Sequence, residues 1–215
     1  MSAGNDDKPL SRGQMRRQAM LDAATQLFLE KGYDRTSLSE IVSRSKGSRT
    51  TLYEQFGSKE GLLRAMIEDV TADIWTVVHG DSANQGGSEA DLVELGLRFA
   101  QAALTARSIA VYRILAAEGA RQPAIAQLFF ELGPRKLETL VAERFRIAFS
   151  GSGMAAAPER LANTFLGSML GLFHSRQVLG LAPERDNVEQ DLADHVRLAV
   201  RVFLDGIGRL PEKSP

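Results

Sequence analysis

Apolar residues recur at helical spacing along almost the whole chain, and this pattern limits the fold more than any other feature. In residues 14–30 they share one face of a predicted helix that ends at Gly32, namely Leu21, Ala24, Leu27 and Phe28. No stretch alternates apolar and polar residues for long enough to indicate a β-strand. Further helices are expected at residues 37–45, 49–56, 58–79, 89–106, 108–119, 123–132, 134–149, 158–180 and 188–206. The sequence therefore predicts an all-α protein of about nine to ten helices.

The composition is that of an ordinary globular protein, with 44% hydrophobic and 25% charged residues. The chain has no cysteine, which excludes disulfides, thiolate metal sites and cysteine nucleophiles, and a reducing cytoplasm is the simplest setting. No apolar run is long enough to span a membrane, so no membrane partner is expected. The net charge of −1 is uneven, since residues 1–64 carry 11 Lys and Arg against 8 Asp and Glu. That bias suits a nucleic-acid site or an ordinary solvated face.

Two short helices joined by a tight turn are the most informative part of the sequence. Ser37 and Glu40 have the spacing of a capping box, which marks the start of the first short helix. A turn at Lys46 interrupts that helix, and Ser48 is expected to cap a second one over residues 49–56. Together with the longer helix before them, these elements follow the plan of a helix-turn-helix unit. In such a unit the second short helix enters the major groove of DNA.

The residue types on the second short helix suit contact with DNA. Leu52 and Phe56, four residues apart, are expected to face the core and leave the polar side chains exposed. Arg49 has the geometry to read guanine O6 and N7. Tyr53 offers a phenolic donor to a phosphate. Lys59 begins the next helix, where its cation and the backbone amides together favour a phosphate.

The segment from Arg17 to Leu62 resembles the DNA-binding domain of TetR-family transcriptional regulators. The resemblance rests on an ordered set of motifs: Ala23-Ala24, Leu27-Phe28, Lys31-Gly32-Tyr33, Thr36-Ser37-Leu38, Ile41, Thr51 through Phe56, and Ser58-Lys59-Glu60. It implies that the side chains nearest base edges are those of Arg49, Thr50 and Thr51. It also implies phosphate contacts for Ser37, Ser48, Tyr53, Gln55 and Lys59.

The turn departs from the family pattern. The family usually has Gly and then Val just before the capping serine, where this chain has Lys46 and Gly47. The change removes a small apolar contact between the two short helices and moves the glycine by one position, so the geometry of this turn is open. Arg16 and Arg17 either reach the DNA backbone as an N-terminal arm or form a solvated helix start.

The resemblance implies four regions: a disordered arm over residues 1–12, a helix-turn-helix domain over 13–62, a ligand-binding and dimerisation domain over 63–208, and a tail over 209–215. The third region is similar to an AefR-like subgroup, through Arg113 to Gly119 with Pro123, Phe129 to Pro134, and Phe165 to Gly167. Many members of that subgroup repress efflux-pump or stress operons. The chain is therefore expected to be a homodimeric repressor of a palindromic operator, released by a small hydrophobic or amphiphilic effector.

Apolar stripes on the last two predicted helices suit a four-helix interface between two subunits. A dimer would place two recognition helices about 34 Å apart, on successive half-sites of the operator. The residues expected at the interface are Phe165, Met169, Phe173, Leu192, Val196, Ala199 and Phe203. The alternative is that both stripes bury only the core of one subunit.

The family resemblance also implies an effector cavity in the C-terminal domain. The side chains expected to line it are Trp75, Phe99, Tyr112, Phe130 and Met169. Each of them could equally be plain core, because amphipathic helices bury aromatic residues in any case. Three further residues are either buried polar partners or surface charges: Arg113, Glu118 and Arg176.

An enzyme and a helical protein-interaction module are the competing classes. The histidines, His79, His174 and His195, lie on separate predicted helices without the i, i+4 spacing of a helical metal site. No phosphate-binding glycine loop, nucleophile elbow or paired-carboxylate motif is present in the sequence. No catalytic residue, metal or cofactor is therefore expected. An interaction module would leave the polar second short helix unexplained.

Overall fold

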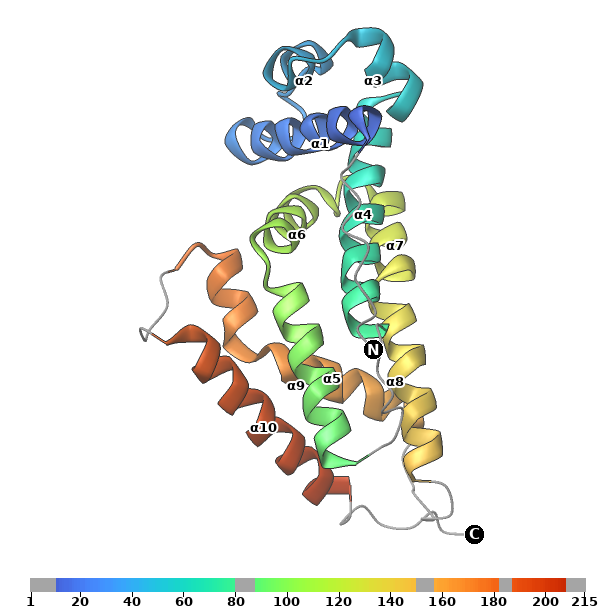
Figure 1. Cartoon of the computed structure of the whole chain (residues 1–215), viewed down its shortest axis with the longest axis vertical. Coiled ribbons are helices and arrows are strands. Elements are labelled where there is room, and N and C mark those ends of the chain that lie inside the picture. The colour runs from blue at the N-terminus through green and yellow to red at the C-terminus, as the bar shows by residue number, and fades with distance from the viewer. Residues whose placement is uncertain (1–10, 80–87, 150–156, 182–186, 208–215) are drawn as a thin grey trace, which may run out of the picture. The chain divides into compact units, whose positions relative to one another are not determined.

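The computed structural model describes residues 11–79, 88–149, 157–181 and 187–207, and within these ranges all regular secondary structure is helical (Figure 1). The helices are α1 (Arg12–Lys31), α2 (Leu38–Ser45), α3 (Arg49–Phe56), α4 (Lys59–His79), α5 (Glu89–Ala103), α6 (Ala106–Glu118), α7 (Pro123–Leu132), α8 (Pro134–Ala148), α9 (Pro158–Val178) and α10 (Val188–Ile207). The all-α prediction is confirmed. The chain divides into two compact units, residues 1–66 and 67–215, and α4 runs from the first into the second. Among the described helices, none combines the length and the apolar character that a membrane span requires.

The first unit is built around α1. This helix begins with a capping box, in which Ser11 Oγ accepts from the Gln14 amide at 3.2 Å and Gln14 Oε1 accepts from the Ser11 amide at 2.8 Å. It ends at Gly32, which has a φ of 85° and donates its amide to the Phe28 carbonyl at 2.9 Å. α1 packs against α2, and α2 against α3. The apolar residues buried in α1–α4 of this unit include Met20, Leu21, Ala24, Leu27, Phe28, Ile41, Leu52, Leu62 and Leu63. This core holds the two short helices in place.

Helices α5, α8, α9 and α10 enclose the core of the second unit. The ring of Phe145 on α8 stacks on Phe203 of α10, with 5.3 Å between centroids, and meets Phe165 of α9 edge-on at 5.6 Å. Gly96 of α5 lets α9 approach closely, because a Cβ at this position would lie 2.5 Å from the sulfur of Met169. These contacts bury the inner faces of α9 and α10 within one subunit.

α9 is bent at Gly171, in a segment for which the sequence predicts an uninterrupted helix. Gly171 has φ 48° and ψ −140°, outside the helical region. A Cβ here would lie 2.8 Å from the ring of His195 on α10, and His195 Nε2 lies 2.8 Å from the Ser168 carbonyl oxygen. Glycine therefore permits both the bend and the close packing of α10.

Arg113 of α6 caps the end of α9. Its Nε donates to the Val178 carbonyl at 2.8 Å, and the same guanidinium also donates to the Gln177 carbonyl. The last carbonyls of a helix lack partners within the helix itself, so a cation that donates to them stabilises the helix end. Of the two roles considered for Arg113, the structure supports a partly buried polar partner, and its partner is α9.

The structure corrects the residues predicted for a dimer interface. Four of them are buried in the core of a single subunit: Phe165, Met169, Leu192 and Val196. The other three are partly buried against the same core: Phe173, Ala199 and Phe203. A side chain buried within its own subunit has no surface left for a partner. The alternative of an intramolecular core therefore holds for the four buried residues.

Candidate DNA interface and cavity

The start of α2 has the predicted capping box. Ser37 Oγ accepts from the Glu40 amide at 3.3 Å, and a Glu40 carboxylate oxygen accepts from the Ser37 amide at 2.9 Å. The ammonium of Lys31 also donates to the Glu40 carboxylate. This bond, with those from Ser37, lowers the pKa of the Glu40 carboxyl to about 2. The Ser37 hydroxyl, which is predicted to contact a phosphate, is therefore already hydrogen-bonded to Glu40.

The turn between α2 and α3 is made by Lys46 and Gly47, each in a different way. Lys46 takes the left-handed conformation, with φ 52° and ψ 31°, so it occupies the position where the related proteins usually have glycine. Gly47 lies against α1, because a Cβ on it would come 2.4 Å from the Met20 methyl carbon and 3.1 Å from Ser45 Oγ. The turn therefore keeps its left-handed residue at position 46, and the shifted glycine serves close packing instead.

α3 has the predicted bounds and the predicted cap. Ser48 Oγ accepts from the Thr51 amide at 3.0 Å. Its apolar side chains, Leu52 and Phe56, are buried, whereas its remaining side chains are exposed or half-buried. The side chains predicted to contact DNA and exposed on this helix are Arg49, Thr50, Tyr53 and Gln55. The inward and outward faces of α3 therefore separate apolar from hydrogen-bonding groups.

Arg49 is held at the outer surface by α2. Its guanidinium Nη2 donates to Ser39 Oγ at 2.6 Å, and both residues are exposed. This bond directs the side chain without burying it. Arg17, one of the two ambiguous arginines of α1, lies with its guanidinium carbon 5.7 Å from the centre of the Phe56 ring, whereas Arg16 is exposed.

Lys59 lies at the first position of α4, but its ammonium points back into the first unit. Nζ donates to the carbonyls of Tyr33 at 2.8 Å, Thr36 at 3.0 Å and Asp34 at 3.2 Å. It also lies 4.5 Å from the centre of the Tyr33 ring. The predicted phosphate contact of Lys59 thus competes with a set of internal hydrogen bonds that sequence spacing does not reveal.

A cavity of about 360 Å³ lies within the second unit, with walls from α4, α5, α6, α7, α8 and α9. Four of the five residues predicted to line an effector cavity are in its wall: Trp75, Phe99, Tyr112 and Phe130. The fifth, Met169, is buried in the core next to Gly96 and is not part of the lining. The volume falls within the range of about 300–1,000 Å³ that is usual for small-molecule pockets.

Sequence reasoning missed two rings of this cavity. Phe129 and His174 both line it, and the ring centroid of His174 is 4.4 Å from that of Tyr112. The only signal for His174 was its position four residues after Leu170, which also lines the cavity. None of the three charged residues considered earlier, Arg113, Glu118 and Arg176, is in the lining.

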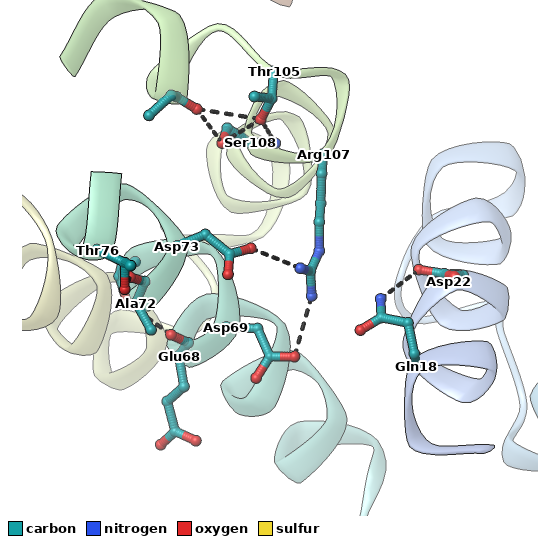
Figure 2. Close-up of polar contacts among 12 residues, drawn as sticks. Gln18, Asp22, Glu68, Asp69, Ala72, Asp73, Thr76, Thr105, Arg107 and Ser108 are labelled. Atoms are coloured by element: carbon teal, nitrogen blue, oxygen red, sulfur yellow. Dashed lines mark hydrogen bonds and ion pairs between the residues drawn. The ribbon is translucent and has the colours of Figure 1, made fainter. Parts of the chain in front are cut away.

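Arg107 ties the start of α6 to α4 (Figure 2). Its Nη1 is 2.8 Å from the Asp73 carboxylate and its Nη2 is 3.1 Å from the Asp69 carboxylate. The two aspartates are one helical turn apart, so one guanidinium reaches both. The next residue, Ser108, lines the cavity. The ion pairs therefore join two parts of the cavity wall, the start of α6 and the helix α4, whose first residues belong to the first unit.

A second and more open hollow, of about 770 Å³, lies along α9 and α10 near the bend at Gly171. Leu172 and Leu198 line it with 76% and 63% of their surfaces exposed. Val202, one turn after Leu198 on α10, is 64% exposed. The outer face of these two helices thus presents apolar side chains to solvent, opposite to the stripe that the sequence pattern indicated.

Comparison with known proteins covers both units. Residues 20–66 match bacterial regulatory proteins of the tetR family, and residues 90–206 match the C-terminal domain of AefR-like transcriptional repressors. The chain belongs to the TetR family of transcriptional regulators. The family assignment makes it a DNA-binding regulator, and its relatives of known class are regulators and not enzymes.

Among relatives of the chain, the HTH-type transcriptional repressor ComR of Escherichia coli is 44% identical over 52 residues, which are 24% of this chain and 25% of ComR. The A-factor receptor protein of Streptomyces griseus is 32% identical over 82 residues, 38% of this chain and 28% of the receptor. The chain thus matches only about a quarter of the length of these two relatives.

Solved structures of transcriptional regulators extend the likeness to most of the chain. A structure described as a TetR-family transcriptional regulator from Mesorhizobium loti has a TM-score of 0.74 at 21% identity, over 92% of this chain and 98% of its own. The flavonoid-responsive regulator FrrA has a TM-score of 0.69 at 27% identity, over 91% of this chain and 98% of its own. The two-unit helical fold is therefore that of the TetR family.

Proposed function

We propose that the chain is a homodimeric, ligand-responsive repressor that binds a palindromic operator in the cytoplasm and leaves it when a small hydrophobic or amphiphilic compound binds. The observation that carries the proposal is the division of α3, whose apolar residues are buried while its hydrogen-bonding residues are exposed. In this proposal residues 13–62 bind DNA and residues 63–208 bind the effector and the second subunit. An efflux or stress operon is the proposed target, by similarity to the AefR-like group.

The side chains of α3 and its surroundings divide into two groups by chemistry. Arg49, Thr50 and Thr51 lie in the first turn of α3, the part of a recognition helix that reaches base edges. By the family resemblance, a second group would contact phosphates: Ser37, Ser48, Tyr53, Gln55 and Lys59. Tyr53 and Gln55 are exposed, the hydroxyls of Ser37 and Ser48 already take part in helix caps, and Lys59 would first have to release its carbonyl partners.

A dimer is proposed because one short recognition helix covers too few bases for operator specificity. The exposed apolar side chains of α9 and α10, among them Leu172, Leu198 and Val202, offer the surface for it. Large apolar side chains that gather on one exposed face are typical of an interaction site. The interface is thus proposed on the outer face of the two helices, in place of the buried residues Phe165, Met169, Leu192 and Val196.

An effector is proposed because the second unit contains an aromatic cavity of suitable volume. The name of the related regulator FrrA says that it responds to a flavonoid, which is a small aromatic compound. The Arg107 ion pairs offer a route by which a change at the cavity wall would alter α4. An effector can shift operator affinity only as far as it prefers one state of the protein over the other.

The experiment is a salt-titrated binding assay on DNA from upstream of the protein's own gene, with unrelated DNA of equal length as competitor. A repressor should prefer a palindromic fragment, and its affinity should fall steeply with salt. Arg49→Ala should lose about 1–3 kcal/mol of discrimination between the operator and mismatched sites. Arg135→Ala, which removes an exposed arginine of α8, is the matched control and should bind as the wild type does. Equal binding to all DNA, or none, would refute the operator.

A further inference from the structure

The polar groups in the wall of the aromatic cavity indicate which ligands it can hold. Two hydroxyls are already used, since Thr71 Oγ1 donates to a carbonyl of its own helix at 2.7 Å and Ser108 Oγ donates to a carbonyl of α5 at 2.8 Å. Four other polar side chains line the cavity and form no hydrogen bond with the described part of the chain: Tyr112, Glu138, Asn163 and His174. Tyr112 and Asn163 are exposed and Glu138 and His174 are half-buried, so water or a bound ligand can supply their hydrogen-bond partners.

Tyr112 and His174 form a pair within this set. Tyr112 comes from α6 and His174 from α9, and their rings meet edge-on with centroids 4.4 Å apart and an angle of 85°. Burial lowers the pKa of His174, so its imidazole is neutral at neutral pH and has one donor and one acceptor nitrogen. The Tyr112 hydroxyl likewise both donates and accepts. A ligand group that both donates and accepts a hydrogen bond best complements such a pair, and a hydroxyl is such a group.

The rest of the wall limits the charge and shape of the ligand. Among the described residues, the lining contains no lysine or arginine, so a carboxylate or phosphate would lose its hydration without gaining a cation. Its one carboxylate, Glu138, is half-buried and stays in contact with water, so a ligand cation would gain little from it. Besides the rings of Tyr112 and His174, the lining contains the rings of Trp75, Phe99, Phe129 and Phe130. The ring of Phe129 lies edge-on to Tyr112 at 6.1 Å, and aromatic walls of this kind favour offset or edge-on contact with another flat ring.

We propose that the cavity binds a flat, uncharged aromatic compound of two or three rings that carries a hydroxyl group, and that Tyr112 and His174 recognise this hydroxyl. The inference rests on the proposed role of the cavity as the effector site. The cavity volume of about 360 Å³ is near the lower end of the usual range for small-molecule pockets, which limits the ligand to this size.

The test uses four probes with the same rings: 2-naphthol, naphthalene, 2-naphthoate and 2-naphthyltrimethylammonium. Trp75 is the single tryptophan of the chain and lines the cavity, so quenching of its fluorescence reports binding at this site. 2-Naphthol should bind most tightly. Naphthalene should bind about three- to tenfold more weakly, since it lacks one net hydrogen bond. The anion and the cation should bind more weakly still. If either charged probe bound more tightly than 2-naphthol, the proposal would be overturned. Tighter binding of the cation would indicate a site centred on Glu138 instead.

Two variants locate the hydroxyl. Tyr112→Phe and His174→Phe each keep an aromatic ring, so naphthalene should bind them as it binds the wild type. The preference for 2-naphthol over naphthalene should fall by about threefold or more in each. Naphthalene serves as the control for folding and for the shape of the cavity. Retention of the full preference in both variants would refute the assigned recognition pair, and if a variant failed to fold, the ranking of probes by the wild type would still decide the ligand class.

Operator binding separates this inference from the proposed function. If the protein binds its operator but none of the probes quenches Trp75, the ligand class is wrong and the repressor proposal stands. If 2-naphthol binds but leaves operator affinity unchanged at saturation, the ligand class stands and the proposed effector role of the cavity fails. A parallel rise in thermal midpoint with 2-naphthol would support binding to the folded state.

Discussion

The ammonium of Lys59 donates to the Tyr33 carbonyl at 2.8 Å and lies 4.5 Å from the centre of the Tyr33 ring. Its other two hydrogen bonds go to the carbonyls of Asp34 and Thr36, so all three of its N–H donors are engaged. A residue of α4 thereby fixes the loop between α1 and α2, on which the position of the two short helices depends.

Lys59→Ala should lower the free energy of unfolding of the protein by about 1.5–3 kcal/mol, because it removes charge-assisted hydrogen bonds to three loop carbonyls. Urea denaturation followed by circular dichroism measures the loss. Lys59→Met, which keeps most of the aliphatic stem but no donor, is the matched comparison and should lose nearly as much. If both variants unfold like the wild type and lose only DNA affinity, the main role of Lys59 is contact with phosphate.

Lys46→Gly should stabilise the protein by up to about 1 kcal/mol. The φ of 52° at Lys46 is a left-handed conformation that disfavours a side chain, and glycine removes this cost while adding some entropy to the unfolded chain. Gly47→Ala is the contrasting variant and should destabilise, since its Cβ would meet Met20 and Ser45. Denaturation midpoints of the two variants test the assignment. The reverse order would mean that the turn in solution differs from the one described.

Leu198→Glu should shift the proposed dimer toward monomer. Leu198 is 63% exposed on the outer face of α10, where a carboxylate would be costly to bury against a second subunit. Ile147→Glu makes the same change at a residue of α8 that is 59% exposed, and should leave the oligomeric state unaltered. Light scattering coupled to gel filtration gives the mass of each. A wild-type mass equal to one chain would remove the dimer from the proposed function.

The free energy of unfolding of the protein should decrease as the pH decreases, and part of this decrease should come from His174. Burial lowers the pKa of His174 below its ordinary value of 6.5, so the unfolded chain binds a proton at a higher pH than the folded chain does. The contribution of the neutral, buried His174 to the free energy of unfolding is therefore complete above pH 6.5. It is lost as the pH falls from 6.5 through the lowered pKa of the folded state. His174→Phe cannot titrate, so the difference between its unfolding free energy and that of the wild type should change over this range. A difference that is constant with pH would contradict the assignment.

Arg107→Ala should weaken the coupling between ligand binding in the cavity and operator binding. The free energy of unfolding should change by less than about 1 kcal/mol, since the ion pairs with Asp69 and Asp73 are partly exposed. The expected result is a smaller ratio of operator affinities without and with ligand, at unchanged ligand affinity. Fluorescence polarisation of labelled operator with and without 2-naphthol measures the ratio. Arg135→Ala controls for loss of an arginine, and an unaltered ratio in Arg107→Ala would rule out this route.

Local features of the fold could be predicted from the sequence alone. The capping box at Ser37, the cap at Ser48 and the bounds of α3 follow from residues within three or four positions of each other. Such hydrogen bonds form wherever the backbone turns into a helix, so they need no knowledge of distant contacts. The same holds for the inward positions of Leu52 and Phe56, which the helical repeat determines. The helix-turn-helix, and with it the candidate DNA-contacting face, was thus predictable.

Contacts between distant residues were decided only by the tertiary structure. Periodicity showed that α9 and α10 carry apolar stripes, but packing against α5 and α8 decided that Phe165 and Val196 face the subunit's own core and Leu172 and Leu198 face outward. The pairing of Tyr112 with His174 and of Lys59 with Tyr33 likewise joins residues far apart in the chain. A stripe of side chains determines which face of a helix is buried, whereas only the arrangement of all the helices determines what lies against that face.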